Sequence, residues 1–226
     1  MMKSLYDYCR QVCISDKIPL SENENIFAYC MDGCPDLRDE NNEYDMARYV
    51  GLPSCHCCDY FFFEEDAISL VELTEIRITK KNMKSRYGKI LGSKISDELS
   101  EEIISKLFQK LIADKNLLKM YGSMTVICQF SKKCKIMRNE CDSRHYKINY
   151  WLVIYDGRKQ DIKALDRIGK EIESRLNERL KGVGGKGKDG VKKDNFVNGV
   201  GVLLPDKLHE KINKCQEYNK HVTSNS

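Results

Sequence analysis

From residue 148 onward, segments with strand-like and helix-like spacing of apolar residues alternate, and this constrains the fold more than any other feature of the chain. Residues 148–155 and 196–204 are rich in β-branched and aromatic residues, as strands are. Residues 162–180 carry apolar side chains at helical spacing, and Pro205 is well placed to begin a last helix. The alternation predicts an α/β fold with a central mixed sheet flanked by helices.

Two further strand-like segments, residues 57–63 and 68–79, lie earlier in the chain. Three acidic residues separate them, so the sequence predicts a β-hairpin. A long helix is expected from Ser96 to near Gly122, with Leu118 in its apolar stripe, followed by a strand over residues 124–130.

The region before the hairpin, residues 1–54, is expected to be an acidic, cysteine-containing helical segment that precedes an α/β core over residues 55–226. Apolar spacing predicts a helix over residues 3–14, and a capping pattern of Ser21 and Glu24 predicts a second one. A third short helix is expected around residues 43–50, ending at Gly51.

Charge is divided unevenly along the chain. Residues 1–66 hold 5 Lys or Arg against 14 Asp or Glu, whereas the remainder holds 33 against 20. A basic surface beside an acidic region is typical of proteins that bind polyanions, so nucleic acid is the expected partner. The expected contacts lie in residues 80–94 and 181–193, namely Lys80, Lys81, Lys84, Arg86, Lys89, Lys186, Lys188, Lys192 and Lys193.

Composition also indicates the cellular setting. No run approaches the roughly 20 apolar residues that span a bilayer, and the start of the chain lacks an apolar signal core, so a cytoplasmic protein without a membrane partner is expected. An odd count of 11 cysteines in such a chain favours reduced thiols or metal ligands over disulfides.

A carboxylate stands on the apolar face of the second hairpin strand. Glu72 alternates with Ile68, Leu70 and Ile76, and a buried carboxylate needs a partner. Asp59 lies near the beginning of the preceding strand, where hairpin pairing would bring it alongside the far half of the second strand, so that the two carboxylates converge. Together they would suit Mg²⁺ or Mn²⁺, which prefer oxygen ligands and activate water. The alternative is structural: Glu72 pairs with a buried Lys or Arg, and Asp59 accepts hydrogen bonds at a strand start.

The run from Cys58 to Phe62, a short acidic turn and the run from Leu70 to Thr74 resemble the Asp…Glu-x-Lys hairpin of the PD-(D/E)XK nuclease superfamily. The resemblance covers mainly residues 57–76 and implies a restriction-endonuclease-like core with metal-dependent phosphodiesterase activity. It implies metal ligation by Asp59 and Glu72, a further carboxylate from Glu22 or Glu24, and supporting polar residues such as Gln109 on the following helix.

The chain departs from the family at Thr74, where the family has its lysine. Within the superfamily this lysine is sometimes relocated, and Lys80, Lys81 or Lys106 are the candidates to replace it. Alternatively the site is degenerate, and the protein is a non-catalytic nucleic-acid-binding or regulatory module that docks on a protein partner or on a second copy.

The cysteines allow a third interpretation of the protein's function. Cysteines in two groups about twenty residues apart would supply a tetrahedral Zn²⁺ site in a zinc-stabilised interaction protein. The candidate ligands are Cys30, Cys34, Cys55, Cys57 and Cys58.

Overall fold

A computed structural model describes the parts of the chain that form the sheet and its helices. They are residues 8–11, 13–15, 18–19, 27–31, 46–64, 67–76, 79, 81–82, 85, 97–133, 147–155, 162–181 and 197–224. Among these residues, no helix combines the length and the apolar character needed to cross a membrane.

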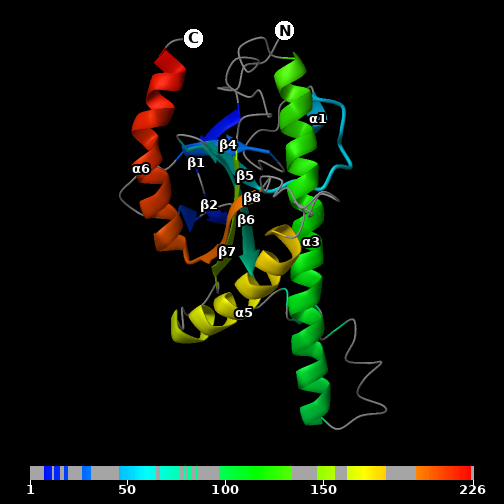
Figure 1. Ribbon diagram of the computed structural model, residues 1–226. Helices are drawn as coiled ribbons and strands as arrows, with labels where there is room; N and C mark the ends of the chain where they lie inside the picture. The colour runs from blue at the N-terminus through cyan, green and yellow to red at the C-terminus, as the bar shows by residue number, and fades with distance from the viewer. Residues whose placement is uncertain are drawn as a thin grey trace, which may run out of the picture.

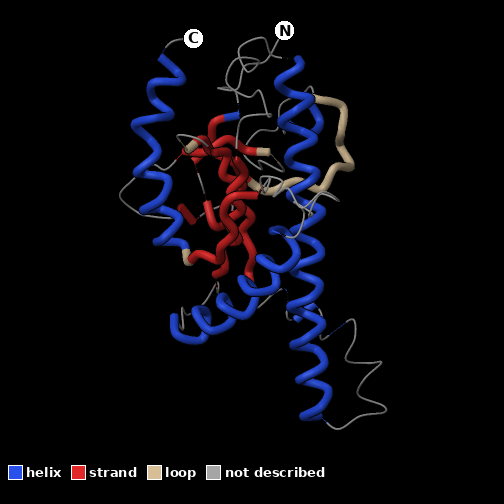
Figure 2. Tube along the Cα trace, viewed as in Figure 1, coloured by secondary structure: helices blue, strands red, loops and turns tan. Residues whose placement is uncertain are grey.

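A mixed sheet forms the centre of the protein (Figure 2). Its strands, in order across the sheet, are β1 (Cys9–Gln11), β4 (Phe27–Cys30), β5 (Tyr60–Phe63), β6 (Ala67–Glu75), β7 (Lys147–Tyr155) and β8 (Val197–Leu203). The strands from β1 to β6 pair antiparallel, and those from β6 to β8 pair parallel. A separate two-stranded sheet joins β2 (Cys13–Ser15) to β3 (Ile18–Pro19).

Helices cover both faces of this sheet. They are α1 (Met46–Tyr49), α3 (Asp97–Lys133), α5 (Ile162–Lys181) and α6 (Pro205–Ser224). Figure 1 shows α6 on one side of the sheet and α3 on the other, with α5 crossing toward α3. The protein therefore has an α/β fold, as the alternation of segments predicts.

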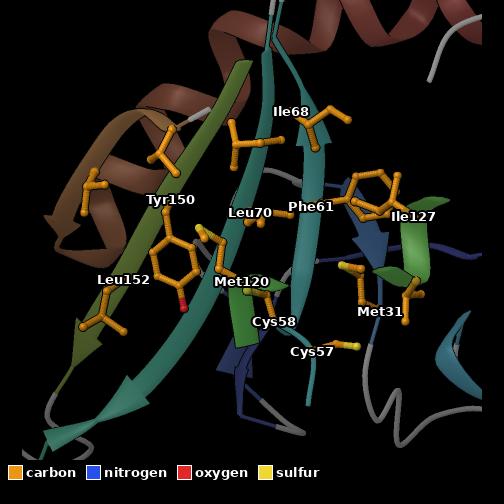
Figure 3. Packing of buried hydrophobic residues seen from close by; sticks show 14 of the residues in the cluster. Met31, Cys57, Cys58, Phe61, Ile68, Leu70, Met120, Ile127, Tyr150 and Leu152 are labelled. Carbon is orange, nitrogen blue, oxygen red and sulfur yellow. The ribbon is translucent and has the colours of Figure 1, made fainter. Parts of the chain in front are cut away.

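Two apolar cores follow from this layering, because side chains along a strand alternate between the faces of the sheet. The main core lies between the sheet and the helices α3 and α5, and Figure 3 shows Phe61, Leu70 and Tyr150 within it. The second core lies under α6, where Leu208 and Ile212 pack against strand residues of the opposite face.

The hairpin, β7, α5, β8 and α6 confirm the elements predicted for them. The short helix before Gly51 is confirmed as α1, and its end is capped as expected. The Gly51 N–H donates to the Arg48 carbonyl at 2.9 Å, and the Leu52 N–H donates to the Ala47 carbonyl at 2.8 Å. Gly51 has a φ of 82°, a conformation that glycine adopts without strain.

The prediction of a helix end near Gly122 and a strand over residues 124–130 is wrong, because α3 continues to Lys133. At 1.5 Å per residue, this helix is about 55 Å long. Gly122 does not end the helix. It makes room for a neighbouring segment instead, since a Cβ there would lie 1.9 Å from the carbonyl oxygen of His56. Leu118, expected in the apolar stripe, is 61% exposed.

The predicted helices over residues 3–14 and after Ser21 are also wrong where the structure describes these residues. Residues 9–11 and 13–15 are strands, and so are residues 27–30. β4 pairs with β5, and β1 pairs with β4, so hydrogen bonds to the edge of the hairpin determine their conformation. Runs of three or four residues are too short to show a helical or a strand-like period.

Candidate functional site

The hairpin places Asp59 opposite Glu72. Tyr60 pairs with Val71, and the antiparallel register carried back by one residue puts Asp59 level with Glu72. Asp59 is also tied to the neighbouring strands, because its Oδ2 accepts a hydrogen bond from the Leu73 N–H at 2.6 Å and its carbonyl accepts one from the Met31 N–H at 3.0 Å. The sequence prediction that these two carboxylates converge is thus confirmed in position.

A lysine from α3 completes the cluster. The Nζ of Lys119 lies 2.7 Å from Oε1 and 2.5 Å from Oε2 of Glu72, and 3.9 Å from Oδ1 of Asp59. Glu72 is 2% exposed and Lys119 is 8% exposed, whereas the Asp59 side chain is 28% exposed. We call Asp59, Glu72 and Lys119 the carboxylate–lysine cluster. Solvent reaches it from the side of Asp59.

One turn earlier on α3, Lys115 stands at the opening of the cluster. Its Nζ lies 3.8 Å from Oε1 of Glu72, and its side chain is 65% exposed. Residues four apart on a helix lie on the same face, so Lys115 and Lys119 present two cations to the same carboxylate.

Burial and charge shift the titration of this cluster. Burial and the nearby charge of Asp59 raise the pKa of Glu72 to about 8, against the opposing influence of Lys119. Burial would lower the pKa of Lys119, but the charges of Glu72 and Asp59 outweigh it and raise that pKa. Lys119 therefore stays protonated near neutral pH.

The segment that leads into Asp59 is docked on α3 beside Lys119. The Cys58 N–H donates to Oγ of Ser123 at 2.8 Å in the buried interior. The residue before Ser123 is Gly122, whose missing side chain lets the His56 carbonyl approach the helix. Ser123 is one turn after Lys119, so this contact fixes Asp59 relative to the lysine.

Behind the cluster lies a buried polar layer. The Tyr150 hydroxyl donates to Oδ1 of Asn116 at 2.6 Å, and Nδ2 of Asn116 donates to the Ile112 carbonyl at 2.7 Å.

Burial, followed by the charge of Glu72, raises the pKa of Cys58 to about 12. Cys58 is therefore a protonated thiol at neutral pH, which is a poor metal ligand and a poor nucleophile.

In a comparison with known proteins, no family model, no curated protein and no solved structure matches this chain.

Several predicted site residues lie outside the described residues or away from the cluster. The structure does not describe Glu22, Glu24, Cys34, Lys80, Lys84, Arg86, Lys89, Lys186, Lys188, Lys192, Lys193 or the side chain of Gln109. Lys81 is exposed. Lys106 is exposed on α3, and thirteen residues separate it from Lys119, which is about 20 Å along a helix. It does not reach the carboxylates from there.

The predicted zinc ligands are not assembled by the described part of the chain. Within it, no three His, Cys, Asp or Glu side chains form a group that could hold a metal ion. Cys30, Cys57 and Cys58 are instead buried, and Cys55 is partly buried. The zinc site thus remains a prediction that depends on residues such as Cys34.

Lys119, which the sequence alone does not single out, lies 47 residues after its partner Glu72. The sequence carries no clear signal for it. Lys119 shares a helix face with Ile112, Asn116 and Ser123, which are all buried in the structure, but two of the three are polar. A face of this composition is not recognised as buried before the structure is known, whereas a buried lysine requires an oppositely charged partner once it is.

Proposed function

We propose that the protein is a divalent-cation-dependent hydrolase of nucleic-acid phosphodiester bonds, with Asp59 and Glu72 as cation ligands. The nuclease superfamily has a lysine in its hairpin, at the position that Thr74 occupies in this chain. Lys119 would perform the role of that lysine. The observation that carries the proposal is the position of Lys119 Nζ, within 4 Å of both carboxylates.

The two carboxylates suit Mg²⁺ or Mn²⁺ in their chemistry. Both offer oxygen ligands, and Mg²⁺ usually takes one or two carboxylates and keeps several waters. The raised pKa of Glu72 reflects burial and repulsion from Asp59, and a cation would relieve both penalties. A bound cation would polarise the phosphate and supply hydroxide near neutral pH.

The side chains of the cluster would then have separate tasks. Lys119 keeps its proton and places a positive charge beside the carboxylates, where negative charge develops on a phosphate during hydrolysis. Lys115 is exposed at the opening, so it is placed to bind a substrate phosphate. The basic composition of the chain after residue 66 favours a polyanionic substrate.

One observation favours a second function. Both oxygens of Glu72 accept hydrogen bonds from Lys119, so the pair is satisfied without a cation. A carboxylate whose two oxygens are both bound by a lysine also suits a non-catalytic module, which binds nucleic acid through its basic surface and needs no cation.

Mn²⁺-dependent cleavage of single- and double-stranded DNA and RNA tests the proposal. We expect Asp59→Asn, Glu72→Gln and Lys119→Met each to reduce cleavage by about 100-fold or more, as loss of a preorganised charge does. Lys132→Met removes an exposed lysine of the same helix and should leave cleavage unchanged. Circular dichroism spectra would confirm that each variant is folded.

The other outcomes are also decisive. Full activity in Lys119→Met, with loss in both carboxylate variants, would remove the lysine from the mechanism. No cleavage of any substrate by the wild-type protein, together with salt-sensitive binding, would overturn the hydrolase in favour of the binding module.

A further inference from the structure

A cleft between α3 and α5 lies outside the carboxylate–lysine cluster. Its volume is about 360 Å³, and its walls are formed by Lys110, Ala113, Arg175, Glu178 and Arg179. This volume lies within the range of small-molecule sites, which is about 300–1,000 Å³. The cleft is therefore large enough to hold a phosphate group together with part of the molecule that carries it.

Positive charge dominates the lining. Three cationic side chains face one acidic side chain, which leaves a surplus of two positive charges. Arg175 and Arg179 are four residues apart on α5 and so share one face of the helix, and Lys110 approaches from α3. Like charges in this arrangement repel one another, and a bound anion would remove that repulsion.

A carboxylate beside the cleft orients one of the arginines. Nη2 of Arg179 lies 3.4 Å from Oδ1 of Asp114, and both side chains are roughly half exposed. An ion pair with this exposure contributes little free energy. One nitrogen makes the contact, whereas a guanidinium carries five N–H donors, so Arg179 keeps donors for a ligand.

We propose that this cleft binds a phosphate group of a nucleotide or a nucleic acid. The planar donor fork of arginine matches the oxygens of phosphate, and a lysine adds a point charge. With Asp114 counted beside the lining, a surplus of one positive charge remains to attract an anion. Ala113, the small residue in the lining, leaves space between the cationic side chains.

The cleft is separate from the proposed hydrolytic site. Lys110 precedes Lys119 by nine residues, which is about two and a half turns, so the two lysines point to opposite sides of α3. Binding in the cleft consequently does not require Asp59, Glu72 or a divalent cation. The proposal stands even where the protein hydrolyses nothing.

Calorimetric titration without divalent cations tests the cleft with three probes: inorganic phosphate, adenosine 5′-monophosphate and a single-stranded oligonucleotide bearing a 5′-phosphate. We expect saturable binding that Arg175→Gln, Arg179→Gln and Lys110→Glu each weaken by about tenfold or more, as loss of a charged hydrogen bond does. Arg167→Gln removes an exposed arginine of α5 outside the cleft and should have little effect.

The three probes also distinguish the source of the phosphate. Binding of all three identifies a general phosphate site, and binding of the oligonucleotide alone identifies a nucleic-acid phosphate. Absence of binding by every probe overturns the proposal, and so does an equal loss in Arg167→Gln. Lys110→Glu changes an exposed side chain, so it keeps the test valid if an arginine variant fails to fold. Repeating the titration with Glu72→Gln separates the cleft from the hydrolase, because its binding should be unchanged.

Discussion

Lys119 and Glu72 form a two-point ion pair in the interior, with Nζ at 2.7 Å from one carboxylate oxygen and 2.5 Å from the other. The pair joins the central helix to the central strand of the protein. Burying two such groups is unfavourable unless each satisfies the other, so neither residue is tolerated without its partner.

Removing one member of this pair is expected to be more damaging than removing both. Lys119→Met or Glu72→Leu alone should each lower the free energy of unfolding by about 3–5 kcal/mol, because the remaining polar side chain stays buried without its partner. The double variant should lose much less than the sum of the two. Urea unfolding of the four proteins measures this coupling.

Lys207→Met provides the control for this comparison of the single and double variants of Lys119 and Glu72. It breaks an exposed pair with Glu210 and should change the unfolding free energy far less. Additive losses in the Lys119 and Glu72 variants would contradict a direct coupling between the two charges.

Stability should depend on pH through Glu72. The pKa of this carboxyl is about 8 in the folded protein, above its usual value of 4.5, so the folded state holds a proton that the unfolded state has released. The unfolding free energy should therefore fall as pH rises from about 4.5 to about 8. Chemical unfolding at several pH values, without divalent cations, measures the slope.

Glu72→Gln removes the titrating group and should flatten that part of the pH profile. Asp59→Asn should move the profile to lower pH, since the charge of Asp59 helps to raise the pKa of Glu72. A profile in Glu72→Gln identical to that of the wild type would show that another group titrates.

Gly122→Ala should displace the segment that positions Asp59. The new Cβ would lie 1.9 Å from the His56 carbonyl oxygen, so helix and segment must separate. We expect a loss of about 1–3 kcal/mol, as in overpacked cores, together with weaker Mn²⁺ binding. Thermal unfolding and Mn²⁺ titration measure the two effects.

Gly201→Ala is the matched control. Its Cβ would lie 2.7 Å from the Trp151 ring, on the sheet face under α6, so it should destabilise the protein without changing Mn²⁺ binding. Equal loss of Mn²⁺ binding in the two variants would mean that the effect of Gly122→Ala is not local.

Tyr150→Phe should cost about 1–3 kcal/mol, because it removes the hydroxyl that donates to Oδ1 of buried Asn116. Tyr121→Phe removes a hydroxyl from an exposed tyrosine of α3 and should be nearly neutral. Thermal unfolding compares the two. A neutral Tyr150→Phe would show that water replaces the lost hydrogen bond.

The sequence predicted the hairpin and the strands and helices of residues 147–224, because these elements are long enough to show a clear period. It also brought Asp59 alongside the far half of the strand that carries Glu72, since pairing follows from alternation and from a short turn. Where the described segments before residue 46 are strands of only two to four residues, their conformation depends on neighbours that are distant in sequence.

Two other features depended on tertiary contacts. Gly122 resembles a helix end in sequence, but in the structure it accommodates the His56 carbonyl against an uninterrupted helix. Lys119 shares its helix face with the polar residues Asn116 and Ser123, so the sequence does not mark it as buried. Its partner Glu72 lies 47 residues earlier in the chain, so only the tertiary structure brings the pair together.

β6 pairs antiparallel with β5 on one edge and parallel with β7 on the other. The first pairing closes a short turn, whereas the second requires a crossover through the whole of α3, and closing a longer loop is slower. We therefore expect the hairpin to form early in folding and the parallel half of the sheet to assemble later. Glu72 would then remain ionised and hydrated until α3 packs against the sheet and brings Lys119 to it.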